Sequence, residues 1–232
     1  MKIAYCFSGY LRRFWTNPTL VQHVIGRAPG DLFIHTWNTL NYAGATWHGD
    51  TGLSNMAVDD VVLSFLRQQY GKATRLVVEA PPAFAPELMP VIQARYSAWR
   101  ANGLKSEVER ERRFTYDLVV NLRFDLLVHE PFTLPRKGLD RLHCLGNANC
   151  VSQALCCDIL NFGSSSVMDV VADLYGAIRD GDVIEANTNS GERFLTRWCA
   201  VNGVPFTYVS VPSSILRSDN SRLEIPLVRA AA

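Results

Sequence analysis

The feature that most constrains this chain is an apolar, β-branched run that ends in a charged tripeptide. The run Leu118 to Leu122 reads Leu-Val-Val-Asn-Leu and continues into Arg123-Phe124-Asp125. A strand that is apolar on both faces is typical of the centre of a mainly parallel sheet with helices on both sides. In open α/β sheets, ligands bind beyond the carboxyl ends of the strands. The run therefore predicts an α/β fold with Arg123 and Asp125 at a binding site.

The remaining sequence alternates strand and helix patterns. Apolar and β-branched runs predict strands at 2–7, 31–37, 75–79, 141–145, 158–162 and 205–211, the last of these being the final strand. Helical periodicity predicts helices from 18 to about 29, at 58–70, at 87–114 (continuous, or broken at Asn102-Gly103), at 167–178 and at 189–202. The charged segment 105–113 is expected to face solvent. Successive βαβ units predict a Rossmann-like N-terminal half and a mixed, mainly parallel central sheet flanked by helices.

Composition narrows the class of protein. The 232 residues, 48% of them hydrophobic, are expected to form one domain, 1–232. A net charge of +1 gives no reason to expect nucleic acid as a partner. We find no apolar stretch long enough to span a bilayer and no signal peptide, so we expect a cytoplasmic protein. The six cysteines lack C-x-x-C spacing and are expected to be reduced and buried, with a structural zinc as the alternative.

The first candidate binding residues follow the first strand. Ser8 and Gly9 are small enough for backbone amides to approach a ligand, and Arg12 and Arg13 could pair with phosphate oxygens. The segment is neither a Walker loop nor a G-x-G-x-x-G motif. The alternative is a tight turn with solvated arginines.

Two further strand ends carry candidate residues. A carboxylate such as Asp125 could hold a divalent cation against a diphosphate, and alternation along an extended chain would direct Arg123 to the same face. The alternative there is an Arg–Asp ion pair at a sheet edge. At the end of the second strand, Trp37 and Asn38 would line the same crevice, with His35 nearby, and Trp37 could stack on a base or sugar.

Two later carboxylates are candidate general bases. Asp158 begins a strand that feeds the Gly163–Ser166 turn, whose serines could simply cap the next helix. Glu192 lies at a predicted helix start. It could deprotonate an incoming hydroxyl, or only close a capping box with Asn189.

Taken together, these segments resemble a family of small bacterial and viral glycosyltransferases with a GT-A-like fold. The matching segments are 3–9 with Arg12, then 31–38, 116–125, 158–169 and Glu192, and they cover most of the chain. The resemblance implies a nucleotide-sugar-binding half, 1–128, and an acceptor-side half, 129–232. It also implies that the donor is bound by Ser8, Gly9, Arg12, His35, Trp37, Asn38 and Arg123.

In such enzymes an aspartate-x-aspartate motif holds Mn²⁺ or Mg²⁺ with the diphosphate. This chain has Arg123-Phe124-Asp125 at that place, so Asp125 is the expected metal ligand. Because one carboxylate of the motif is replaced, Arg123 or Arg12 could supply the positive charge instead of a metal.

The resemblance implies transfer of a sugar from a nucleotide-diphosphate sugar to a hydroxyl of a glycan or glycolipid, in surface polysaccharide or glycoconjugate synthesis. Glu192, or Asp158 as the second choice, would deprotonate the acceptor, and direct displacement would invert the anomeric configuration. One alternative is a non-catalytic nucleotide-sugar or glycan-binding module. Another is a different Rossmann-like transferase, such as a methyltransferase. The sequence leaves the donor sugar, nucleotide, acceptor, linkage and oligomeric state open.

Overall fold

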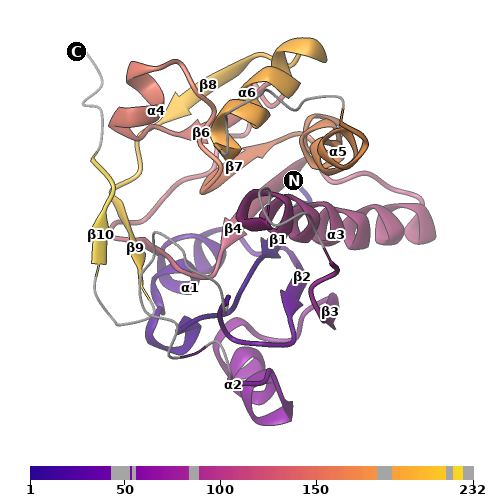
Figure 1. The fold of residues 1–232 in the computed structure, drawn as a ribbon, viewed down its shortest axis with the longest axis vertical. Helices are drawn as coiled ribbons and strands as arrows, with labels where there is room; N and C mark the ends of the chain where they lie inside the picture. Colours follow the sequence, from indigo (N-terminus) through magenta and orange to yellow (C-terminus); the bar gives the residue numbers. More distant parts are fainter. Residues whose placement is uncertain (43–52, 54–55, 84–88, 182–189, 218–221, 227–232) are drawn as a thin grey trace.

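The chain is built around a seven-stranded mixed sheet with the strand order β3-β2-β1-β4-β7-β6-β8 (Figure 1). This computed structural model describes residues 1–42, 53, 56–83, 89–181, 190–217 and 222–226. The strands of this sheet are β1 (Ile3–Ser8), β2 (Asp31–Trp37), β3 (Arg75–Glu79), β4 (Leu118–Arg123), β6 (Leu142–Leu145), β7 (Leu160–Gly163) and β8 (Phe206–Val209). Neighbouring strands run parallel except where β7 is a partner. The predicted mixed, mainly parallel sheet is therefore confirmed, with β4 at its centre.

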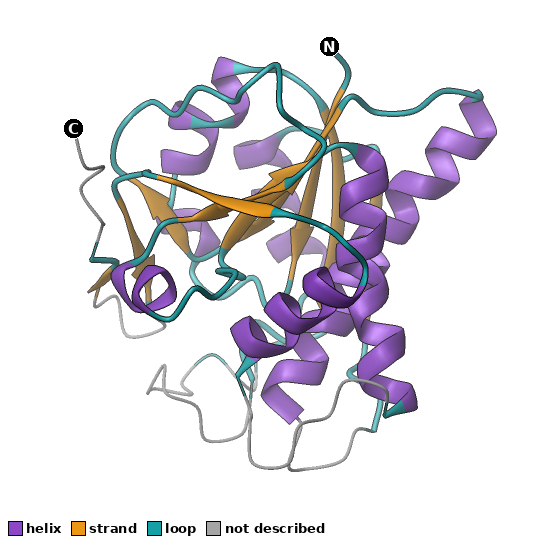
Figure 2. Ribbon diagram, turned by 90° about the horizontal axis from the view of Figure 1, so that it is seen from above, coloured by secondary structure: helices purple, strands orange, loops and turns teal. Residues whose placement is uncertain are grey.

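Helices cover both faces of the sheet (Figure 2). They are α1 (Thr19–His23), α2 (Asp60–Tyr70), α3 (Met89–Arg112), α4 (Ala148–Ser152), α5 (Ser165–Asp180) and α6 (Gly191–Val201), with the 3₁₀ turns η1 (Phe14–Thr16) and η2 (Ile25–Arg27). Side chains of β1 alternate between the faces. The thiol of Cys6 contacts Ala101 on α3, whereas Phe7 packs on Tyr70 at the end of α2. This arrangement explains why β1 and β4 are apolar on both faces.

A second, smaller sheet holds the turn after β4 in place. It consists of β5 (Leu126–Val128), β9 (Ser213–Leu216) and β10 (Arg222–Glu224), paired in the order β10-β9-β5. The amide of Leu216 donates to the carbonyl of Asp125 at 2.8 Å. The prediction that 205–211 holds the last strand is wrong, because β9 and β10 follow it. These strands are too short, and too rich in serine and charge, for a strand pattern to be recognised.

The predicted helix from 18 to about 29 is also wrong in its length. It ends at His23, because Val24 leaves helical geometry, with φ −121° and ψ −72°. The side chain of Asn17, just before it, is fully buried and donates to the carbonyls of Phe124 and Leu126 at 3.0 and 2.8 Å. Asn17 thus fixes the backbone on both sides of Asp125.

Helix α3 runs unbroken through Asn102-Gly103, which resolves the two alternatives for this segment. The expectation that 105–113 faces solvent is wrong for its first part, since Lys105 and Val108 are fully buried. The ammonium of Lys105 donates to Ser165 and Asp169 on α5 at 2.6 and 2.7 Å. Packing against α5 therefore hides a face that the charge pattern alone assigned to solvent.

Candidate functional site

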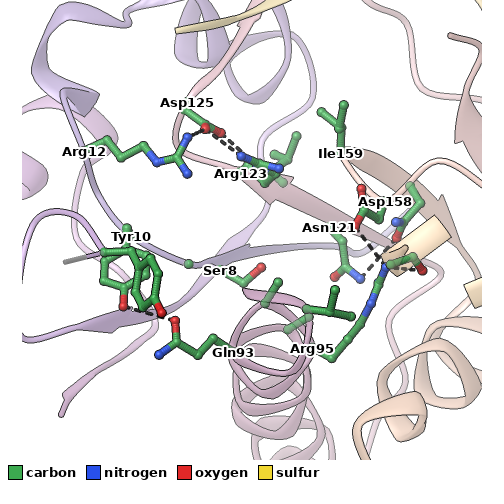
Figure 3. A pocket seen from close by; sticks show the side chains of 18 of the residues that line it. Ser8, Tyr10, Arg12, Gln93, Arg95, Asn121, Arg123, Asp125, Asp158 and Ile159 are labelled. Carbon is green, nitrogen blue, oxygen red and sulfur yellow. Dashed lines mark hydrogen bonds and ion pairs between the residues drawn. The ribbon is translucent and has the colours of Figure 1, made fainter. Parts of the chain in front are cut away.

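A cavity of about 410 Å³ lies where β1, β2 and β4 end, against the first turns of α3 (Figure 3). The register places Ser8 of β1 beside Arg123 of β4, so these strand ends share one edge of the sheet. From the N-terminal half, the residues predicted for the site that line the cavity are Ser8, Gly9, Arg12, Trp37, Arg123 and Asp125. From the C-terminal half they are Asp158 and Glu192. The fold thus brings eight of the ten predicted residues to one cavity.

The loop after β1 turns sharply into this cavity. Gly9 has φ +99°, a conformation that favours glycine. Its amide donates to the hydroxyl of Ser97 at 2.6 Å. This amide is therefore bound within the protein, while Gly9 lines the cavity and its contact with a donor stays a prediction. Gly9 lets the chain turn so that Arg12 reaches the end of β4.

One end of the cavity holds an aspartate between two arginines (Figure 3). Arg123 donates from Nε to Oδ1 of Asp125 at 2.9 Å and from Nη2 to Oδ2 at 2.7 Å, and Arg12 donates from Nη1 to Oδ2. Phe124 and Asp125 form a turn, so this turn, and not strand alternation, brings Asp125 back onto Arg123. Burial lowers the pKa of Arg12. Burial also acts to lower the pKa of Arg123, but the Asp125 charge prevails and raises it. Two positive charges thus face one negative charge.

The residues around Asp125 do not form a metal-ligand set. Both of its oxygens accept hydrogen bonds from arginine, and its side chain is 3% exposed. In the part of the chain that the structure describes, no group of three or more His, Cys, Asp or Glu side chains is placed to hold a metal ion. Two guanidinium groups thus pair with Asp125, the residue that the sequence predicted as a metal ligand.

The other end of the cavity is organised by Arg95 of α3, a residue that the sequence analysis missed. Its Nη2 donates to Oδ2 of Asp158 and to the carbonyl of Gly191, both at 3.0 Å. Arg95 therefore joins α3 to the bend just before β7 and to the first turn of α6. No motif marks it. The available signal was its spacing of three residues from the buried Ile92, on the face of α3 that packs inward.

Glu192 lines the cavity from the first turn of α6. Its Oε2 accepts from the hydroxyl of Ser190 at 2.8 Å. Ser190, and not Glu192, caps the helix, because the Ser190 side chain accepts from the amide of Arg193. Asn189, the other half of the predicted capping box, lies outside the described residues. The predicted cap after β7 is confirmed, since the Ser164 side chain accepts from the amide of Val167.

Two predicted donor-binding residues do not line the cavity. His35 is fully buried, with Nδ1 2.7 Å from the hydroxyl of Ser97 and Nε2 2.8 Å from Glu79. Burial lowers its pKa to about 4, although the Glu79 bond acts in the opposite direction. Asn38 is exposed, and its backbone bonds to Glu79 and Val58. His35 acts on the site through Ser97, which holds the amide of Gly9.

Aromatic rings line a further wall of the cavity. Trp37 lines it but is only 1% exposed, because its ring stacks on Tyr96 at 5.6 Å. Tyr10 and Tyr42, which the sequence analysis did not single out, also line it and are half-buried. Their ring centroids are 6.2 Å apart. These two tyrosines offer more open aromatic surface to a base or sugar than Trp37 does.

The cysteines lie in the core. All six are free and buried, and they pack with the other apolar residues. The expectation that they serve as small core residues is confirmed.

The arrangement can bind an anionic group at the arginine end while it presents carboxylates to a second group at the other end. No described helix has the length and apolar character that crossing a membrane requires. Neither a protein-family model nor a curated protein matches the sequence.

Proposed function

We propose that this protein is a GT-A-like glycosyltransferase that moves a sugar from a nucleotide-diphosphate donor to a hydroxyl of a glycan or glycolipid. The observation that carries the proposal is that the cavity has arginines at one end and carboxylates at the other. Arg12 and Arg123 lie at the carboxyl ends of the central strands, whereas Asp158 and Glu192 enter from the second half of the chain. A donor's diphosphate and an acceptor's hydroxyl need these two environments.

The arginine end suits the leaving group. As the bond between the sugar and the diphosphate breaks, the diphosphate takes the electron pair and gains negative charge. Positive groups fixed beside it stabilise the transition state more than the ground state. Arg12 and Arg123 together carry one charge more than Asp125 neutralises. In this proposal they provide the stabilisation with no step assigned to a metal ion, and Tyr10 and Tyr42 offer a surface for the base.

Glu192 is the better candidate base of the two carboxylates. Asp158 is held in an ion pair with Arg95, whereas the partner of Glu192 is a neutral hydroxyl. In the proposed step the acceptor oxygen forms a bond to the anomeric carbon, its proton passes to Glu192, and the nucleoside diphosphate leaves. Direct displacement of this kind inverts the anomeric configuration.

The test begins with binding of UDP, GDP, ADP and dTDP, and of their sugar nucleotides, by calorimetry with and without Mn²⁺. Arg123→Gln should raise the dissociation constant of the diphosphate by about ten- to a hundredfold, the loss expected for hydrogen bonds to a charged group. Arg110→Gln, an exposed arginine of α3, is the matched control. Binding that requires Mn²⁺ and is lost in Asp125→Ala would show that Asp125 binds a metal ion in the donor complex.

Turnover is then measured with glycan and glycolipid acceptors. Glu192→Gln should lower kcat by about 10²- to 10⁴-fold with donor affinity unchanged, and the exposed Glu130→Gln should not. Donor binding without turnover of any acceptor would leave the non-catalytic binding module. A product of retained configuration would remove the role given to Glu192, and failure to bind any nucleotide would overturn the proposal.

A further inference from the structure

Two residues that line the cavity each hold a buried side-chain atom with no hydrogen-bond partner within the described parts of the chain. The two atoms are Nε of Arg95 and Oδ1 of Asn121, and the two residues are 6% and 9% exposed. Buried donors and acceptors are nearly always paired. An unpaired group has given up its hydrogen bonds to water without replacing them, which costs free energy. Two such atoms on residues that line one cavity indicate that a bound ligand makes the missing hydrogen bonds.

The remaining polar atoms of these side chains hold them in fixed orientations. Nη2 of Arg95 is bound to Asp158 and to Gly191, and Nδ2 of Asn121 donates to Oδ1 of Asn161 on the adjacent strand β7 at 3.2 Å. Figure 3 shows Arg95, Asn121 and Asp158 together at one end of the cavity, away from Arg12 and Asp125. The free N–H and the free carbonyl oxygen therefore belong to one preformed region.

A ligand group that satisfies both atoms must accept one hydrogen bond and donate another. A hydroxyl does this with a single oxygen, whereas a carboxylate or phosphate oxygen only accepts. The local charge makes the same distinction. Asp158 and Glu192 line the cavity together with Arg95, so an acidic ligand group beside Arg95 would also meet two carboxylates. An acidic group here would face repulsion.

We propose that the Arg95–Asn121 end of the cavity binds a neutral, hydroxyl-bearing sugar, with one sugar hydroxyl accepting from Nε of Arg95 and donating to Oδ1 of Asn121. The inference rests on the proposed function, since it places the sugar next to a diphosphate held by Arg12 and Arg123. It adds the class of sugar: a neutral hexose is accepted, and a uronic acid is rejected.

The first experiment measures sugar-nucleotide binding by the unmodified protein. Calorimetry compares the nucleoside diphosphate that binds best with its glucose, galactose and glucuronate derivatives. We expect at least one neutral sugar nucleotide to bind at least about tenfold more tightly than the glucuronate. A glucuronate that binds as tightly as the neutral sugars would overturn the inference and leave the proposed function standing.

Two variants test the residues themselves. Arg95→Lys keeps a cation for Asp158 but lacks Nε, and Asn121→Ala lacks the carbonyl oxygen. Each should weaken binding of the neutral sugar nucleotide about tenfold and leave binding of the diphosphate unchanged, because one hydrogen bond to the sugar is lost. The matched controls are Arg75→Lys, at a side chain that is 41% exposed, and Asn149→Ala, at an exposed residue.

The diphosphate separates the possible failures. If a variant loses affinity for the diphosphate and the sugar nucleotide equally, the subsite is structural and the inference is overturned. If the diphosphate binds but the sugar adds nothing to affinity in either variant or in the unmodified protein, the inference fails alone. If no nucleotide binds at all, the proposed function fails and the inference fails with it.

Discussion

At the scale of single residues, a relay of hydrogen bonds links the end of β3 to the loop after β1. Glu79 accepts from Nε2 of His35, whose Nδ1 then accepts from the hydroxyl of Ser97. The hydroxyl oxygen of Ser97 accepts from the amide of Gly9 at 2.6 Å. This chain of bonds requires a neutral His35, since a proton on Nδ1 would remove that acceptor and leave the hydroxyl of Ser97 with the backbone carbonyl of His35, 3.4 Å away. A fully buried histidine that does not line the cavity therefore holds one of its walls in place through Ser97.

His35 makes the stability of the protein depend on pH. Its pKa is lowered from 6.5 to about 4, mainly by burial, so the unfolded chain binds a proton at a higher pH than the native protein does. The stabilisation is complete above pH 6.5 and is lost as the pH falls towards 4. It amounts to at most about 3 kcal/mol. Denaturant unfolding at several pH values measures this loss.

His35→Gln should flatten the pH dependence between pH 6.5 and 4, because the titrating group is gone. His129→Gln, a change at a partly exposed histidine that contacts Glu224, is the control and should keep the slope of the unmodified protein. Equal slopes for His35→Gln and the unmodified protein would show that His35 is not the group responsible.

At the scale of elements, α3 is the support on which both halves of the site rest. It carries Ser97, which holds the loop of Gly9, and Arg95, which holds Asp158. Its second half is clamped to α5 by Lys105 and by Asn102, whose Nδ2 donates to Asp169 at 2.7 Å. These contacts keep α3 continuous through Gly103, a residue of low helix propensity.

Gly103→Ala should stabilise the protein by about 0.5 to 1 kcal/mol. Alanine restricts the unfolded chain and favours the helix, and a Cβ at Gly103 would have nothing within 4 Å. Gly30→Ala is the contrasting variant, because its Cβ would lie 2.5 Å from the carbonyl oxygen of Ile3. In chemical denaturation, the free energy of unfolding should be higher for Gly103→Ala, and lower for Gly30→Ala, than for the unmodified protein. A destabilised Gly103→Ala would mean that α3 is strained at that turn.

At the scale of the whole molecule, the two halves of the chain share one sheet and one core. Strand β4 pairs with β7 across the boundary at residue 128, and β5 pairs with β9. Helices α3 and α5 also pack together across that boundary. The halves 1–128 and 129–232 therefore divide the proposed functions, but they are joined by the centre of the sheet.

Unfolding should consequently occur in a single transition. Far-ultraviolet circular dichroism and tryptophan fluorescence should give coincident thermal curves, as expected when all elements unfold together. The fragment 1–128 should not fold alone, since it would expose the β7 edge of β4 and the α5 face of α3. Two resolved transitions, or a fragment with a cooperative melt, would contradict this prediction.

Local patterns in the sequence determined the first half of the sheet. Residues 31–37 and 75–79 are predicted with the bounds that β2 and β3 have, because an apolar, β-branched run between turn residues is typical of a strand. The same logic placed Ser8 and Arg123 at strand ends, and so at one edge of the sheet. Short strands such as β9 and β10 escaped prediction, because a few residues hold too little periodicity.

Tertiary packing decided what the site residues contact. Arg12 meets Asp125 from 113 residues away, and Arg95 meets Asp158 and Gly191 from 63 and 96 residues away. His35 faces Ser97 on α3 and not the cavity for the same reason. A local pattern shows which face of an element is buried, but the identity of its neighbours depends on how α3, β7 and α6 pack together. Local sequence patterns thus predicted which strand ends lie together at one edge of the sheet, whereas the packing of the folded chain sets which of their side chains line the cavity and meet there.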